Sequence, residues 1–179
     1  MIGVLIIGSG IAGLACARTL AAVGFAPVVL DKGRGIGGRV ATRRVGAMQF
    51  DHGAQYVTAQ NPSFAALLSE LETDGALAKW PGEGDRPRYV GRPGMSALAK
   101  AFGVGLDIRQ GVQVKGITKT DDGWALQLGD SVLKARRVVL TVPAPQVAGL
   151  IGAEHQLVAD LAPVRLAPCL TLMAAVTGP

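Results

Sequence analysis

The chain has 179 residues, of which 49% are hydrophobic and 17% are charged, and its formal net charge is +5. A chain of this length can bury roughly 70% of the surface that it exposes when unfolded, so the composition excludes a disordered protein and is typical of a globular one. Aromatic residues are only 4% and do not alternate with the basic ones, which excludes a nucleic-acid surface built from cations and stacking rings.

The first 31 residues show a strand–turn–helix–strand pattern. Residues 2–7 form an apolar run, broken only by Gly3, that is typical of a strand buried on both faces. Apolar residues at helical spacing over 14–21 predict a helix, and a second apolar run over 28–30 predicts a strand that ends on Asp31. This is the context in which a glycine-rich turn binds a nucleotide.

The turn between the first strand and the helix reads G-S-G-I-A-G from Gly8. Gly8 permits the tight turn, Gly10 lacks the Cβ that would hold a pyrophosphate away from the backbone, and Gly13 lets helix and strand pack closely. The helix directs free N–H groups, including those of Ile11 and Ala12, and about half a positive charge towards the phosphates. We therefore predict a dinucleotide-binding site.

Asp31 is the acidic residue that such a site needs at the end of its second strand. We expect its carboxylate to accept hydrogen bonds from both hydroxyls of an adenosine ribose. A carboxylate at this position also repels a 2′-phosphate, so the site should not hold the adenosine of NADP.

A second glycine-rich turn follows Lys32 and ends in Arg39. Gly37 and Gly38 let the chain pass close to a ligand, and the guanidinium of Arg39 offers a fork of donors for phosphate oxygens. The alternative is that Arg39 is an ordinary surface arginine.

The G-x-G-x-x-G turn, the acid after the second strand and the G-G-R motif occur here in the order found in FAD proteins of the glutathione-reductase type. The sequence resembles the branch that contains amine oxidases, desaturases and renalases, although Asp31 stands where Glu is commoner. The resemblance implies FAD as the cofactor. It implies FAD contacts from Gly8, Gly10, Ile11, Ala12, Gly13, Asp31, Lys32, Gly38 and Arg39.

A strand predicted over 47–50 leads into the small and polar stretch 51–58, in which Gly53 indicates backbone lying against a ligand. This stretch, D-x-G-A-Q-Y-x-T, resembles the renalase signature, which implies that Gln55 and Tyr56 lie at the flavin end of the cofactor. His52 is either a catalytic base or a hydrogen-bond partner, and no residue is assigned a catalytic role.

The middle of the chain leaves the nucleotide fold. A helix predicted from Asn61 to near Gly75, capped by Asn61 or Ser63, precedes a turn-rich hydrophilic stretch over 80–87. Trp80 and Tyr89 either line a substrate pocket or belong to the local core.

The chain then returns. We predict a helix over 96–102, a strand over 106–108, and three antiparallel strands over 112–118, 124–128 and 132–140, because D-G at 122–123 and G-D at 129–130 favour hairpins. The resemblance implies that the backbone of Val114 lies against adenine, and the alternative is an ordinary strand valine. A final strand is predicted over 168–174.

These elements predict an α/β protein. We expect a Rossmann-like FAD-binding domain, with a parallel sheet and a three-stranded antiparallel meander, at residues 1–58 and 94–145. Part of an interleaved α+β substrate domain is expected at 59–93 and 146–179. The sequence resembles about the first half of such a protein.

The resemblance implies a renalase-like FAD-dependent oxidoreductase. Its small-molecule donor would be a dihydronicotinamide dinucleotide that passes a hydride to flavin N5, and oxygen would then reoxidise the flavin to give hydrogen peroxide. A dihydropyridine needs no base, which agrees with the absence of a paired-carboxylate or His/Asp pattern. The alternatives are an FAD-dependent amine oxidase and a nucleotide-binding fragment without turnover.

Cysteine and histidine usage predicts neither disulfides nor a metal site. Cys16 and Cys169 lack a disulfide pattern, so we expect reduced thiols in a cytoplasmic protein, and His52 and His155 lack metal-ligand spacing. No basic region precedes the apolar N-terminus, which we interpret as the cofactor turn and not as a signal peptide. No membrane span is expected.

Overall fold

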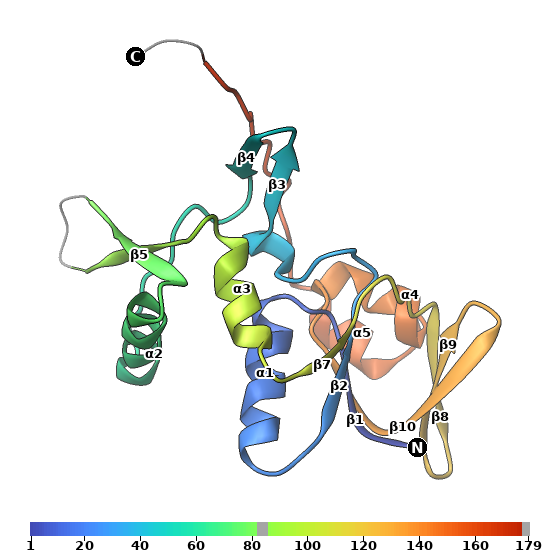
Figure 1. Cartoon of the computed structure of the whole chain (residues 1–179). Helices are drawn as coiled ribbons and strands as arrows, with labels where there is room; N and C mark the ends of the chain where they lie inside the picture. The colour runs from blue at the N-terminus through green and yellow to red at the C-terminus, as the bar shows by residue number, and fades with distance from the viewer. Residues whose placement is uncertain (82–85, 177–179) are drawn as a thin grey trace. The chain divides into compact units, whose positions relative to one another are not determined.

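A computed structural model describes residues 1–81 and 86–176, which belong to two compact units (Figure 1). Unit 1 contains Met1–Ile36 and Gly105–Cys169. Unit 2 contains Gly37–Val104 and the described residues from Leu170 onwards.

Unit 1 is built on a six-stranded sheet with the order β7-β2-β1-β10-β9-β8. Neighbouring strands from β7 to β10 pair in parallel, whereas β9 pairs antiparallel with both β10 and β8. The predicted α/β fold, a Rossmann-like parallel sheet continued by a three-stranded meander, is confirmed. The strands are β1 (Ile2–Ile7), β2 (Pro27–Leu30), β7 (Asp107–Arg109), β8 (Gly116–Thr120), β9 (Gly123–Leu128) and β10 (Ser131–Leu140).

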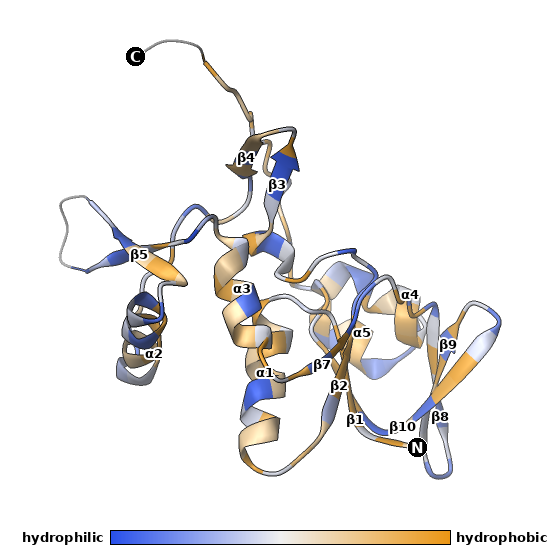
Figure 2. Ribbon diagram, viewed as in Figure 1, coloured by the Kyte–Doolittle hydropathy of each residue, from blue (hydrophilic) through white to orange (hydrophobic). Residues whose placement is uncertain are grey.

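The central strand β1 is buried on both faces because its side chains alternate between two apolar clusters. Val4 and Ile6 pack with Ala17 of the helix α1 (Ile11–Ala22), and Leu5 and Ile7 pack with residues of β2 and the meander. Figure 2 shows β1 and β2 coloured mostly as hydrophobic, as strands covered on both faces require.

The meander begins later than predicted, at Gly116 instead of residue 112. The backbone N–H of Val112 donates to the carbonyl of Asp31 at 2.9 Å, so Val112 is held at the end of β2, and the first bond to β9 is that of the Lys115 N–H to the carbonyl of Gln127 at 2.8 Å. The predicted hairpin is confirmed, with its turn one residue earlier than the D-G pair: Asp121 and Asp122 form the turn, and Gly123 opens β9 opposite Thr120. Gly123 has a φ of 145°, which residues other than glycine rarely adopt.

The described residues of unit 2 form two α-helices and two β-hairpins, and neither hairpin was predicted. In α2 the Asn61 side chain accepts from the N–H groups of Ser63 (2.9 Å) and Phe64 (3.3 Å), so Asn61 is the N-cap and Ser63 is not. The elements are the 3₁₀ turn η1 (Gly38–Val40), β3 (Thr42–Val45), β4 (Met48–Asp51), α2 (Pro62–Thr73), β5 (Leu77–Trp80), β6 (Arg88–Gly91) and α3 (Ser96–Gly103).

β5 and β6 form a hairpin, and the predicted turn-rich stretch over 80–87 connects them in the sequence, with only Trp80 of it in a strand. Trp80 pairs with Arg88 at the end of the hairpin next to this stretch, and residues 82–85 lie outside the described part of the chain. Tyr89 is only 5% exposed, so it belongs to the local core, whereas Trp80 is 43% exposed and free to line a pocket.

The predicted strand over 168–174 is wrong for the described chain. Leu170 is 99% exposed, and no strand within residues 1–81 and 86–176 supplies the backbone hydrogen bonds that an apolar extended segment needs. Before it, η2 (Ala144–Gln146) and the short helices α4 (Ala148–Ile151) and α5 (Gln156–Leu161) follow the sheet, and α4 packs against β8. None of the helices in the described residues has the length and apolar character to cross a membrane.

Candidate dinucleotide-binding site

The turn from β1 into α1 is fastened to both neighbouring strands. The N–H of Gly8 donates to the carbonyl of Leu30 at 2.8 Å. On the other side, Oγ1 of Thr141 lies 2.9 Å from the carbonyl oxygen of Ile7 and 3.0 Å from that of Gly8. Because Gly8 has a φ of 109° and a Cβ there would lie 2.7 Å from Thr141 Oγ1, only glycine fits.

Gly13 and Gly10 are needed for different reasons. A Cβ at Gly13 would lie well inside 3.0 Å of the carbonyl oxygen of Gly8, so Gly13 lets α1 approach the end of β1, as predicted. A Cβ at Gly10 would meet nothing within 4 Å, and the backbone of Gly10 (φ −67°, ψ 171°) suits any residue. The protein's own packing therefore does not explain Gly10, whereas an approaching ligand does.

The start of α1 offers unpaired donors. Gly10 is the N-cap and has no side chain to cap the helix, and the N–H of Leu14 donates to the carbonyl of Gly10 at 3.0 Å. The N–H groups of Ile11, Ala12 and Gly13 precede this bond and have no helical acceptor. Donors of this kind beside open space at Gly10 fit the diphosphate of a dinucleotide.

Asp31 is held by donors from the protein itself. Its Oδ2 accepts from the backbone N–H of Ser9 at 2.6 Å and from the Ser9 hydroxyl at 2.7 Å, and its Oδ1 accepts from the N–H of Gly33 at 2.7 Å. The contact with Ser9 was not predicted. The sequence offered one signal for this contact. Ser9, a hydroxyl residue, lies between Gly8 and Gly10, in the turn whose site was predicted to include the Asp31 carboxylate.

The remaining predicted contacts divide between the two units. Lys32 is exposed in unit 1, and Val114 is 7% exposed within the apolar cluster of the meander, also in unit 1. Their roles towards FAD stay predictions, as do those of the unit 2 residues. The unit 2 residues are Gly38, Arg39, Gln55 and Tyr56, and all four are exposed.

Gly53 is required by packing within the chain itself, and the ligand contact that its motif indicated stays a prediction. A Cβ at Gly53 would lie well inside 3.0 Å of the carbonyl oxygen of Arg39. The N–H of Ala54 donates to the same oxygen at 2.9 Å. The D-x-G-A-Q-Y stretch is therefore docked on the G-G-R turn within unit 2.

A hydrogen-bonded network fixes Asp51 at the end of β4. Its Oδ1 accepts from the hydroxyl of Thr42 at 2.6 Å and from the N–H of Met95 at 3.0 Å. Oγ1 of Thr42 in turn accepts from the N–H of Ser96 at 3.0 Å. Two donors at the start of α3 are thus capped from the β3–β4 hairpin, and a Cβ at Gly94 would lie 2.7 Å from Thr42 Oγ1.

We expect Thr42→Val to destabilise the protein by about 1–3 kcal/mol, because it leaves the Ser96 N–H without its acceptor and removes one of the two donors to Asp51. Urea unfolding measures the loss. Thr42→Ser keeps the hydroxyl and should restore most of the stability, so equal losses in both variants would contradict a hydrogen-bond origin.

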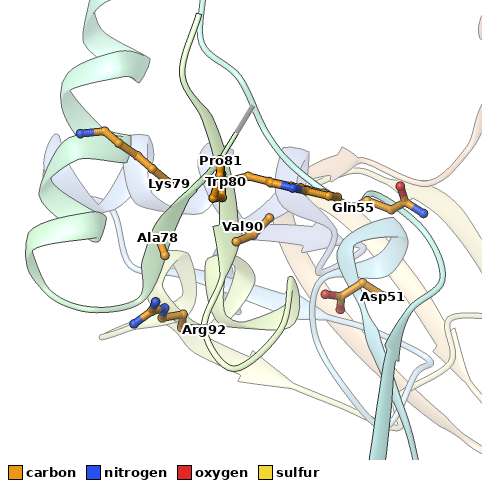
Figure 3. A pocket seen from close by; sticks show the side chains of 8 residues that line it. All are labelled: Asp51, Gln55, Ala78, Lys79, Trp80, Pro81, Val90 and Arg92. Atoms are coloured by element: carbon orange, nitrogen blue, oxygen red, sulfur yellow. The ribbon is translucent and has the colours of Figure 1, made fainter. Parts of the chain in front are cut away.

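A cavity of about 560 Å³ lies beside this network, and all of its lining residues belong to unit 2 (Figure 3). In this view the Asp51 carboxylate and Gln55 lie on one side of Val90, and the charged ends of Lys79 and Arg92 lie on the other. Lys79 pairs with Glu72 of α2 at 3.3 Å. The lining is completed by Ala78, Trp80 and Pro81.

An aromatic pair flanks the cavity. Tyr56 and Trp80 meet edge to face with ring centroids 5.9 Å apart, and the guanidinium carbon of Arg88 lies 5.3 Å from the Tyr56 centroid. These contacts hold two half-exposed rings in place. The alternation of L-A-K-W and R-Y-V-G around a turn-rich stretch was the signal that could have predicted the hairpin behind them.

The described residues contain no group of three or more His, Cys, Asp or Glu placed to hold a metal ion. Cys16 and Cys169 are free thiols, half-buried and exposed respectively.

The sheet and its glycine turn define an α/β protein of the Rossmann type, with helix N–H donors at the start of α1 that suit a dinucleotide. Residues 6–71 match the sequence profile of the NAD(P)-binding Rossmann-like domain, and residues 77–170, more than half of the chain, match that of the flavin containing amine oxidoreductases. The chain belongs to the flavin containing amine oxidoreductase family, and its cofactor is FAD.

Solved structures share the fold at low sequence identity. A protein from Exiguobacterium sp. 255-15, provisionally named a protoporphyrinogen oxidase, has a TM-score of 0.71 and 14% identity over 90% of this chain and 63% of its own. A fatty acid isomerase from P. acnes that produces CLA has a TM-score of 0.71 and 13% identity over 89% of this chain and 63% of its own. A putrescine oxidase with redesigned cofactor binding has a TM-score of 0.62 and 16% identity over 83% of this chain. The chain spans 59% of that oxidase and thus less than two thirds of each of the three.

Proposed function

We propose that this protein is a renalase-like FAD-dependent oxidoreductase that takes a hydride from a dihydronicotinamide-type donor. The observation that carries the proposal is the cavity of unit 2, because its lining suits a flat ring with a carboxamide. The bound flavin supplies a hydride acceptor at N5, and oxygen then takes up the two electrons with two protons to give hydrogen peroxide.

The lining of the cavity provides three kinds of contact. Ala78 and Val90 offer an apolar floor and Trp80 an aromatic wall, which suit a dihydropyridine ring. The amide of Gln55 carries both a donor and an acceptor, as a nicotinamide carboxamide requires. Arg92 adds a guanidinium suited to the phosphates of a dinucleotide donor. In this proposal these residues bind and orient the donor.

The proposed reaction needs no protein base, because loss of a hydride makes the dihydropyridine ring aromatic. The cavity lining agrees with this: among the described residues that line it, Asp51 is the only carboxylate, and Oδ1 of Asp51 is already engaged by Thr42 and Met95. His52, the candidate base, is exposed and does not line the cavity.

An amine oxidase is the second candidate. Asp51 at the cavity, next to the aromatic pair of Tyr56 and Trp80, is a combination that attracts an organic cation such as a protonated amine. A nucleotide-binding module without turnover is the remaining alternative.

Flavin absorbance under anaerobic conditions separates the three candidates. FAD-loaded protein is mixed either with borohydride-treated NAD, which contains misreduced dihydronicotinamides, or with a panel of amines. We expect the first mixture alone to bleach the flavin and, after air is admitted, to produce peroxide. Bleaching by amines alone would favour the amine oxidase, and retained colour in both mixtures would favour the binding module. Trp80→Ala should raise the KM for the donor without releasing FAD.

A further inference from the structure

Ser9 has its side chain buried in the nucleotide turn of unit 1. It is 0% exposed and is the one buried polar residue in the part of the chain that the structure describes. Its hydroxyl donates to Oδ2 of Asp31 at 2.7 Å. A hydroxyl so enclosed cannot touch a cofactor directly, so any influence on the cofactor must act through Asp31.

Asp31 has few acceptor positions left for a ligand. A carboxylate has about four lone-pair positions, two on each oxygen. The hydroxyl and the backbone N–H of Ser9 both donate to Oδ2, and the N–H of Gly33 donates to Oδ1. Three positions are therefore filled within the protein, and about one remains, on Oδ1.

Backbone hydrogen bonds also fix the chain at Asp31 and beside Ser9. The Asp31 N–H donates to the carbonyl of Arg109 at 3.0 Å, and the Asp31 carbonyl accepts from the N–H of Val112 at 2.9 Å. Gly8, next to Ser9, is bonded to Leu30, next to Asp31. The carboxylate therefore cannot turn to present Oδ2 to a ligand without breaking its bonds to Ser9.

We infer that Ser9 is a positioning residue that holds Asp31 so that its carboxylate accepts a hydrogen bond from only one hydroxyl of the adenosine ribose of FAD. The inference rests on the assignment of Asp31 to the ribose. It revises the expectation, drawn from the sequence, that both ribose hydroxyls donate to Asp31.

A double-mutant cycle on FAD affinity tests whether Ser9 acts through Asp31. Binding of FAD to apoprotein is followed by quenching of flavin fluorescence. We expect Ser9→Ala to weaken FAD binding about fivefold in the wild type, the value of roughly one hydrogen bond. In the Asp31→Ala background, Ser9→Ala should have no further effect. Equal weakening in both backgrounds, or none in the wild type, would overturn the inference.

Thr141→Val is the matched control for this cycle. Thr141 is bonded to the same turn, at Ile7 and Gly8, but not to Asp31. Its effect on FAD affinity should therefore be the same factor in the wild type and in the Asp31→Ala background. Thermal unfolding of each apoprotein shows whether the variants are folded.

FAD analogues with a 2′-deoxy or 3′-deoxy adenosine ribose test the hydroxyl count on the unmodified protein, even where a variant fails to fold. We expect one analogue to bind about tenfold more weakly than FAD and the other to bind within about twofold. In Ser9→Ala the carboxylate is no longer held in one orientation towards the ribose, so discrimination between the analogues should shrink. Similar losses for both analogues with the wild type, or none for either, would overturn the inference. The binding assay contains no electron donor, so its result does not depend on whether the protein oxidises a dihydronicotinamide.

Discussion

Gly13→Ala is expected to unfold unit 1 or to destabilise it by at least about 3 kcal/mol. The new Cβ would lie well inside 3.0 Å of the Gly8 carbonyl oxygen and 2.8 Å from Thr141 Oγ1. Neither the backbone of Gly8 nor the start of α1 can yield without losing the hydrogen bonds that hold the turn. Overpacking against backbone exceeds the cost of about 1–3 kcal/mol that is typical of an extra methylene in a core.

Urea unfolding with a reporter in unit 1 measures this loss. The protein has two tryptophans, Trp124 in unit 1 and Trp80 in unit 2, so a Trp80→Phe background leaves Trp124 to report on unit 1. Gly3→Ala is the matched control, because Gly3 lies in β1 and a Cβ there meets nothing within 4 Å. We expect this control to change stability by no more than about 1 kcal/mol. Wild-type stability of Gly13→Ala would contradict the close approach.

The parts of the fold that were predicted correctly depend on neighbours along the chain. The buried strand at 2–7, the glycine turn and the helix that follows are encoded within 21 consecutive residues. The hairpin of β8 and β9 is likewise specified locally, because Gly123, directly after its turn, has a φ that only glycine readily adopts. Local rules were sufficient in each case.

The errors arose where a partner distant in sequence decides the structure. The stretch 168–174 has the apolar pattern of a strand, but no described strand pairs with it. Asp51 and Met95 are 44 residues apart, so the capping of α3 by the β3–β4 hairpin could not be predicted from either segment. The two hairpins of unit 2 lack an N-G or D-G turn among their described residues, and their alternation alone was not interpreted as pairing.

In the candidate site too, features set by local spacing were predicted and a contact between distant residues was not. Gly8, Gly10, Gly13 and Asp31 were predicted because a nucleotide turn requires those residue types at that spacing. The hold of Ser9 on Asp31 could not be predicted, because it depends on a side-chain rotamer that reaches a residue 22 positions away. The sequence was thus sufficient to predict a site for the cofactor, whereas the number of acceptor positions left on Asp31 required coordinates.

Gly10→Val is expected to abolish most FAD binding while leaving the protein folded. Gly13→Ala, in contrast, is expected to lower the stability of the fold itself. Gly10 has backbone angles open to any residue and free space where a side chain would begin. The substitution should therefore lower the free energy of unfolding by no more than about 1 kcal/mol, the usual loss caused by a poor N-cap residue. The added side chain would fill the space in front of the N–H groups of Ile11 and Ala12, where the pyrophosphate has to approach.

We expect the affinity of apoprotein for FAD to fall on the order of 100-fold, equivalent to about 2.7 kcal/mol. Flavin fluorescence quenching gives the affinity, and urea unfolding without FAD gives the stability of the same samples. Gly10→Ala, with a smaller side chain in the same place, should lie between the wild type and Gly10→Val in affinity. If Gly10→Val bound FAD as tightly as the wild type, the pyrophosphate could not rest on this turn. An unfolded Gly10→Val would instead show that the space at Gly10 is needed by the protein itself, and the division of roles between Gly10 and Gly13 would be lost.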